Sequence, residues 1–131
     1  ALGGDVAGAL TLLPAGEHAE IGASSEPRLI DKLEFTQILA ELPRRPFLVG
    51  DDGIRMSLAG AQPKLPIIMV DNQPALPGVG QPTTHIVKPE IERFPGSVAN
   101  EAFAMRLAAA VGLPVARVWA RRAGDIAYLL V

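Results

Sequence analysis

The chain has 131 residues, of which 49% are hydrophobic and 20% are charged, and its formal net charge is −2. A chain of this length forms one domain or part of one, and its apolar content is sufficient for a buried core. The weakly acidic balance, without a basic stripe, argues against direct binding of DNA or RNA. The absence of cysteine excludes disulfides and thiolate metal sites and fits a cytoplasmic protein.

Metal, membrane and export functions are not expected either. His18 and His85 are far apart and lack companion ligands at metal spacing. No run of 18 apolar residues is present, so neither a membrane span nor a membrane partner is expected. The first residues lack the basic segment of a signal peptide. Because the chain lacks an initiator methionine and stops within an apolar run, we expect it to be part of a longer protein.

The first third of the chain predicts short elements separated by turns. Residues 6–13 indicate a strand, and residues 14–28 indicate a loop. Residues 34–42 predict a short helix, because apolar side chains recur there at helical spacing and a proline follows. The Pro-Arg-Arg-Pro segment at 43–46 indicates a break between two parts of the chain.

The remainder of the chain predicts mainly strands. Their expected ranges are 54–58, 65–70, 83–88, 115–119 and 126–131. A turn is expected at 71–73, before a stretch rich in proline and glycine, and a hairpin connection at 121–125. These connections are too short for parallel crossovers, so the strands are expected to pair antiparallel. The predicted fold class is α+β, with one antiparallel sheet and a helix packed against it.

Residues 97–111 predict the longest helix, because alanine, leucine and methionine dominate the segment. Ser97 is expected to cap its N-terminus, and Gly112 to follow its C-terminus. One apolar stripe recurs every four residues at Phe103, Leu107 and Val111. Phe103 and Trp119 are expected in the core.

Residues 57–64 read SLAGAQPK and lie between two predicted strands. The segment is not a Walker A motif, which needs two spaced glycines, then Lys-Ser or Lys-Thr, and then a helix. Small residues between two strands are also what protein kinases use to cover nucleotide phosphates. From the pattern alone, an ordinary hairpin turn and a phosphate-covering loop both remain open.

Lys88 and Glu101 each have two interpretations. Lys88 follows an apolar strand, so its side chain either reaches solvent or is buried against an anionic partner. Glu101 lies one turn into the long helix, where it either interacts with the helix dipole or points to Lys88. Kinases use such a lysine–glutamate pair, in which the glutamate orients the lysine that binds phosphate.

Three segments, MSLAGAQPK, PTTHIVKP and NEAFAMRLAAAVGLPVA, resemble the HipA family of bacterial serine/threonine kinases. These kinases are the toxins of HipA–HipB toxin–antitoxin modules and their relatives. The resemblance extends upstream to GGDVAGALTLLP and is weakest across residues 14–50. It implies part of the HipA N-terminal subdomain at 1–50 and a protein-kinase-like N-lobe at 51–131.

The resemblance also implies a role for each matching residue. Lys88 would bind the phosphates of ATP, and Glu101 would orient Lys88. Ser57 matches the family's autophosphorylated serine, where added negative charge would disturb the neighbouring loop. The residues expected to form the ATP phosphate loop are Ala59, Gly60, Ala61, Gln62, Pro63 and Lys64.

In the family, the catalytic aspartate, its asparagine and the aspartate that binds Mg²⁺ lie beyond the equivalent of Val131. The chain is therefore expected to contain no catalytic residue or metal ligand and to lack kinase activity alone. Implied partners of the full protein are ATP, Mg²⁺, a protein substrate and a HipB-like antitoxin that contacts DNA. Two alternatives are a non-catalytic docking module for such an antitoxin and an unrelated α+β domain.

Overall fold

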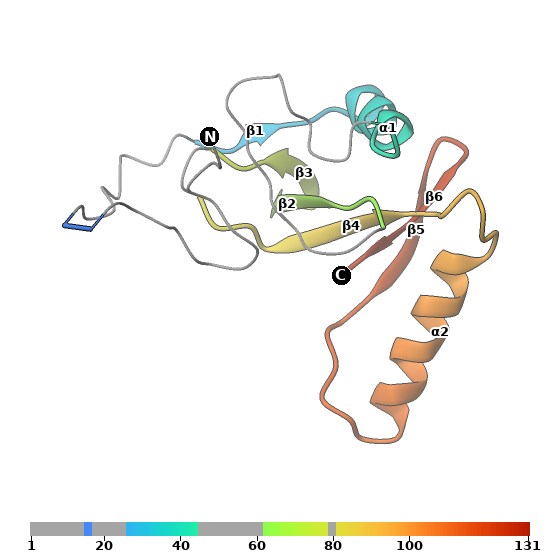
Figure 1. The fold of residues 1–131 in the computed structure, drawn as a ribbon. Helices are drawn as coiled ribbons and strands as arrows, with labels where there is room; N and C mark the ends of the chain where they lie inside the picture. Colours follow the sequence, from blue (N-terminus) through green and yellow to red (C-terminus); the bar gives the residue numbers. More distant parts are fainter. Residues whose placement is uncertain (1–14, 17–25, 45–61, 79–80) are drawn as a thin grey trace.

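A computed structural model describes residues 15–16, 26–44, 62–78 and 81–131. The strands predicted at 6–13 and 54–58 lie outside the described residues. The described residues form the following helices and strands, in chain order: β1 (Arg28–Leu29), α1 (Lys32–Glu41), β2 (Leu65–Val70), β3 (Gln73–Leu76), β4 (His85–Pro89), α2 (Ser97–Ala110), β5 (Trp119–Ala123) and β6 (Ile126–Leu130) (Figure 1).

The strands form one sheet in the order β1-β3-β2-β4-β6-β5. Every neighbouring pair is antiparallel, which confirms the predicted pairing and the α+β class. The bounds of β2 are those predicted. Strand β4 begins two residues later than predicted and ends at Pro89.

The two helices cover opposite faces of the sheet, with α1 above it and α2 below it in Figure 1. The alternation along β6 shows this directly, because neighbouring residues of a strand point to opposite faces. Tyr128 and Leu130 are buried in the cluster formed with α1, whereas Leu129 is buried in the cluster formed with α2. The larger cluster joins residues 30–42 to residues 65–130 in one core, so both sides of the predicted break pack together in the described part of the chain.

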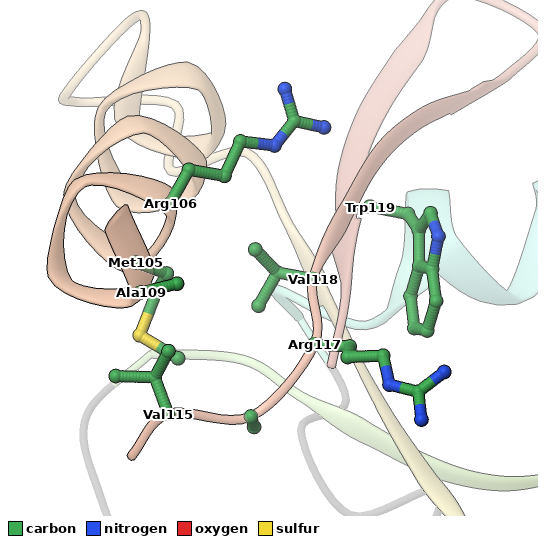
Figure 2. A pocket seen from close by; sticks show the side chains of 8 residues that line it. Met105, Arg106, Ala109, Val115, Arg117, Val118 and Trp119 are labelled. Atoms are coloured by element: carbon green, nitrogen blue, oxygen red, sulfur yellow. The ribbon is translucent and has the colours of Figure 1, made fainter. Parts of the chain in front are cut away.

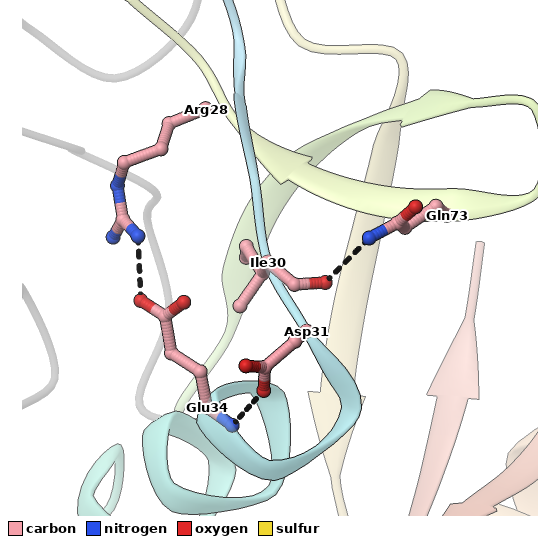
Figure 3. Close-up of polar contacts among 5 residues, drawn as sticks. All are labelled: Arg28, Ile30, Asp31, Glu34 and Gln73. Carbon is pink, nitrogen blue, oxygen red and sulfur yellow. Dashed lines mark hydrogen bonds and ion pairs between the residues drawn. The ribbon is translucent and has the colours of Figure 1, made fainter.

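Helix α1 begins at Lys32, two residues before the predicted start. Asp31 is its N-cap, and the Asp31 carboxylate accepts a hydrogen bond of 2.8 Å from the backbone N–H of Glu34. Glu34 also pairs with Arg28 of β1 at 2.6 Å. Gln73 donates to the carbonyl oxygen of Ile30 at 3.3 Å, which ties the start of the helix to β3 (Figure 3). Polar contacts therefore fix the helix start, while Phe35 and Leu39 supply its buried face.

Strands β1 and β3 were not predicted. The expected turn at 71–73 is real, but Gln73 already belongs to β3. Asp71 and Asn72 have φ angles of 49° and 65°, which match the left-handed conformation that favours two-residue hairpins. β3 was missed because it contains Pro74, which is unfavourable within a strand, and β1 was missed because it has only two residues.

The predicted hairpin between the last two strands is present, but the bounds predicted for its first strand, 115–119, and for its connection, 121–125, are wrong. Strand β5 begins only at Trp119 and continues through Ala123, and Gly124 and Asp125 make the turn. β5 lies at the edge of the sheet, where Arg121 and Arg122 can remain exposed. The charged residues that suggested a loop are therefore compatible with a strand at this position.

Helix α2 begins at the predicted residue, but its N-cap is Gly96 rather than Ser97. Its buried positions are Val98 and Ala102, and Met105 packs against the same cluster. The predicted stripe of Phe103, Leu107 and Val111 is exposed instead, and Trp119 is also more than one-third exposed. Small and apolar residues occupy most positions around the circumference of this helix, so the spacing of its apolar residues does not indicate which face is buried.

Candidate functional site

Lys88 lies on β4 and faces α2. It is paired in register with Leu129, which is buried beneath that helix. Its neighbour Val87 points to the opposite face and packs in the cluster that includes α1. The strand therefore directs the Lys88 side chain into the space between the sheet and α2, rather than away from the protein.

Glu101 meets Lys88 there. The distance from Lys88 Nζ to Glu101 Oε1 is 2.6 Å, so the ammonium group donates to the carboxylate. The side chains are 22% and 33% exposed, which places the pair at the border between core and solvent. Of the two interpretations of each residue, the structure supports the ion pair. An ammonium group has three donors, so a lysine held in this way retains the capacity to bind an anion.

A short connector, residues 90–96, brings the two side chains together. The Glu90 N–H donates to Ala127 of β6 at 2.9 Å, which anchors the beginning of the connector. At its end, Gly96 has a φ angle of 85°, and α2 starts at the next residue. Glu101 then projects from the second turn of α2 toward β4. The lysine and the glutamate were predicted from the sequence, whereas the connector that places them was not.

The end of the SLAGAQPK segment approaches the same region. Gln62, Pro63 and Lys64 are half-buried and lead directly into β2. Gln62 Nε2 donates to the carbonyl oxygen of Pro89 at 3.4 Å, a long hydrogen bond one residue beyond Lys88. The other predicted loop residues and the predicted phosphorylation site lie outside the described residues. These are Ser57, Ala59, Gly60 and Ala61.

A separate hollow of about 290 Å³ lies between the C-terminal half of α2 and the segment that leads into β5 (Figure 2). Val118 points across it toward α2, whereas the Trp119 ring lies on the other side of the strand. The lining residues are Met105, Arg106, Ala109, Val115, Ala116, Arg117, Val118 and Trp119. Neither Lys88 nor Glu101 lines this hollow, which was not predicted from the sequence.

The described residues contain no cluster of three or more histidine, cysteine, aspartate or glutamate side chains that would hold a metal ion. Within the same part of the chain, neither helix has the length and apolar character needed to cross a membrane. The candidate site in the described residues thus consists of Lys88, its carboxylate partner Glu101, and Gln62 at the end of the small-residue segment.

Comparison with known proteins places this arrangement in a family. Residues 56–131 match the family described as "HipA-like C-terminal domain". The chain is 53% identical over 133 aligned residues to "Putative kinase Y4mE" of Sinorhizobium fredii, and the match covers 99% of the chain and 32% of that protein. It is 34% identical over 118 residues to "Serine/threonine-protein kinase toxin HipA" of Shewanella oneidensis, with coverage of 90% and 26%.

The fold is also similar to a solved structure. A chain in the complex of HipA, HipB and operator DNA from Shewanella oneidensis MR-1 matches with a TM-score of 0.66 and 31% identity. The match covers 95% of this chain and 28% of that chain. The protein is therefore an α+β member of a kinase family, and specifically the chain belongs to the HipA family. It spans about a third or less of the length of these relatives.

Proposed function

We propose that the chain is the ATP-binding N-lobe of a HipA-like serine/threonine protein kinase. The observation that carries the proposal is the Lys88–Glu101 ion pair, held at 2.6 Å between β4 and α2. In protein kinases, a strand lysine paired with a helix glutamate binds the phosphates of ATP. Membership of the HipA family supports the same assignment.

Each predicted residue has a place in this proposal. Lys88 binds ATP phosphate oxygens, and Glu101 holds the ammonium group in position. The residues that cover the phosphates are Ala59, Gly60, Ala61, Gln62, Pro63 and Lys64. Ser57, next to this loop, is the autophosphorylation site, where the charge of a phosphate would compete with ATP for the same region. The contact of Gln62 with Pro89 supports a position for the loop end close to Lys88.

The complete enzyme would transfer the γ-phosphoryl group of ATP to a serine or threonine of a protein substrate. Mg²⁺ would neutralise phosphate charge, and its protein ligands would come from residues other than those of this chain. By this proposal, the 131 residues alone have no phosphotransferase activity. The proposed range of the N-lobe is 51–131, and residues 1–50 belong to the N-terminal subdomain.

Nucleotide photocrosslinking of the full-length protein tests the lysine assignment. Azido-ATP should label the wild type, and Lys88→Ala should reduce the labelling about tenfold or more. Lys32→Ala is the matched control, because Lys32 is exposed at the start of α1 on the other side of the sheet. Equal labelling of wild type and Lys88→Ala would show that Lys88 does not bind the nucleotide.

A HipB-like antitoxin is the proposed partner, and DNA would be contacted through that partner. The support is the similarity to a chain in a complex of HipA, HipB and operator DNA, together with a net charge of −2, which does not favour direct attraction to the phosphates of DNA. A pull-down with the product of the neighbouring gene is the test. Retention of that product by the full-length protein, but not after deletion of residues 1–131, would favour a docking role for this chain.

A further inference from the structure

Two side-chain hydrogen bonds, made by Glu90 and Ser97, join the two ends of the connector between β4 and α2. We call this pair of contacts the neck. Glu90 Oε1 accepts a hydrogen bond of 2.6 Å from the backbone N–H of Gly96. In the reverse direction, Ser97 Oγ accepts a bond of 3.0 Å from the backbone N–H of Ile91. Glu90, at the start of the connector, and Ser97, the first residue of α2, therefore each supply one side-chain acceptor to a backbone N–H near the opposite end of the connector.

This neck coincides with the N-terminus of α2. The first N–H groups of a helix have no partner within the helix, and a capping side chain usually supplies one. Gly96 is the N-cap residue and has no side chain to do so. Glu90 provides an acceptor from outside the helix, and its negative charge is favourable next to the positive end of the helix dipole. The Ser97 hydroxyl accepts its hydrogen bond from the backbone N–H of Ile91 and does not cap its own helix.

The neck is also joined to the sheet. The backbone N–H of Glu90 donates to Ala127 of β6, one residue after the end of β4. Inside the connector, Phe94 donates to Ile91 at 2.8 Å and Ser97 donates to Phe94 at 3.1 Å. The start of α2 is therefore bonded to Glu90, which follows β4 in the chain and is itself hydrogen-bonded to β6, and one turn further along the helix Glu101 meets Lys88.

We propose that Glu90 and Ser97 are positioning residues that hold α2 so that Glu101 stays paired with Lys88. Neither residue was predicted to have a functional role from the sequence. In kinases, placing the glutamate-bearing helix against the lysine is a controlled step. Here the neck contacts link the start of the helix to Glu90 and, through its backbone N–H, to β6. This inference rests on the proposed function, because it assumes that the Lys88–Glu101 pair serves to bind a nucleotide.

Binding of the fluorescent nucleotide mant-ATP to the full-length protein tests the inference. Glu90→Ala/Ser97→Ala should weaken binding about tenfold, which corresponds to about 1.4 kcal/mol. Glu90→Gln/Ser97→Thr retains both acceptor oxygens and should bind within about twofold of the wild type. Glu92→Ala, at an exposed carboxylate of the same connector, is the control and should also leave binding unchanged.

A mutant cycle separates positioning from general destabilisation. If the neck acts through Glu101, the double alanine change should alter mant-ATP affinity less than about twofold when Glu101 is already alanine. An equal loss in both backgrounds, or no loss in the wild-type background, would overturn the inference. Should the double alanine variant fail to fold by circular dichroism, Ser97→Ala alone enters the same cycle with the same criteria.

The two proposals fail in different ways. If Lys88→Ala weakens mant-ATP binding but the neck variants do not, the nucleotide site stands and the positioning role is wrong. If Lys88→Ala leaves binding unchanged, the proposed function is wrong, and the positioning inference is refuted with it.

Discussion

The Lys88–Glu101 pair should contribute more to folding than the Arg28–Glu34 pair, although both have a nitrogen–oxygen distance of 2.6 Å. The perturbation is a pair of double-mutant cycles. One uses Lys88→Met and Glu101→Leu, and the other uses Arg28→Met and Glu34→Leu. The coupling free energy of each cycle measures the interaction between the two paired residues. Effects of one residue alone, such as the interaction of Glu34 with the dipole of its own helix, cancel.

The difference in burial sets the expected magnitude. Two unit charges at 2.6 Å attract by about 1.6 kcal/mol at the dielectric constant of water and by about 6 kcal/mol at an effective value near 20. Desolvation and side-chain ordering offset much of this attraction. The side chains of Arg28 and Glu34 are 54% and 35% exposed, so we expect a coupling of about 0.2–1 kcal/mol for that pair. For Lys88 and Glu101, which are less exposed, we expect about 1–2 kcal/mol.

Urea unfolding followed by tryptophan fluorescence is the assay. Trp119 is the only tryptophan and lies on β5, so the signal reports the sheet that carries Lys88. The free energy of unfolding comes from linear extrapolation, and the slope should stay constant among the variants. Equal coupling energies in the two cycles, or a smaller value for Lys88–Glu101, would refute the reasoning that burial strengthens this pair.

Two further predictions concern α1. Leu39→Ala should lower the free energy of unfolding by about 2–5 kcal/mol, because Leu39 is 1% exposed, whereas Leu33→Ala, at a residue 69% exposed, should change it by less than about 0.5 kcal/mol. A comparable loss in both variants by urea unfolding would contradict the placement of the helix. Asp31→Ala should cost about 1 kcal/mol by removing the acceptor for the Glu34 N–H, and Asp31→Asn should retain most of the stability in the same assay. Loss of stability in the asparagine variant equal to that in alanine would argue against the cap.

The sequence predicted the bounds of β2 better than those of the edge strand β5. Apolar content located β2 with its observed bounds, and Leu65 and Ile67 are buried in the first half of the strand. Strand β5 was misplaced because its solvent-facing arginines resemble those of a loop. Pairing with β6, rather than the composition of the segment, makes it a strand.

The site shows the same division. Lys88 and Glu101 were identified because their order along the chain matches a known pair, and the structure brings them together. Glu90 and Ser97 carry no comparable signal, since a glutamate and a serine near a helix start usually serve as ordinary capping residues. Their proposed roles involve the left-handed backbone at Gly96, which the residue types around it do not indicate.

The position of β6 has a consequence for how the protein is made. β4 pairs with β6, the last strand of the chain, and Leu129 of β6 lies beneath α2 opposite Lys88. During synthesis, Lys88 and Glu101 leave the ribosome before the strand that supports both of them. Pairings between such distant segments form slowly, because a long loop must close first. Incomplete nascent chains should therefore lack the Lys88–Glu101 pair until the β5–β6 hairpin has joined the sheet.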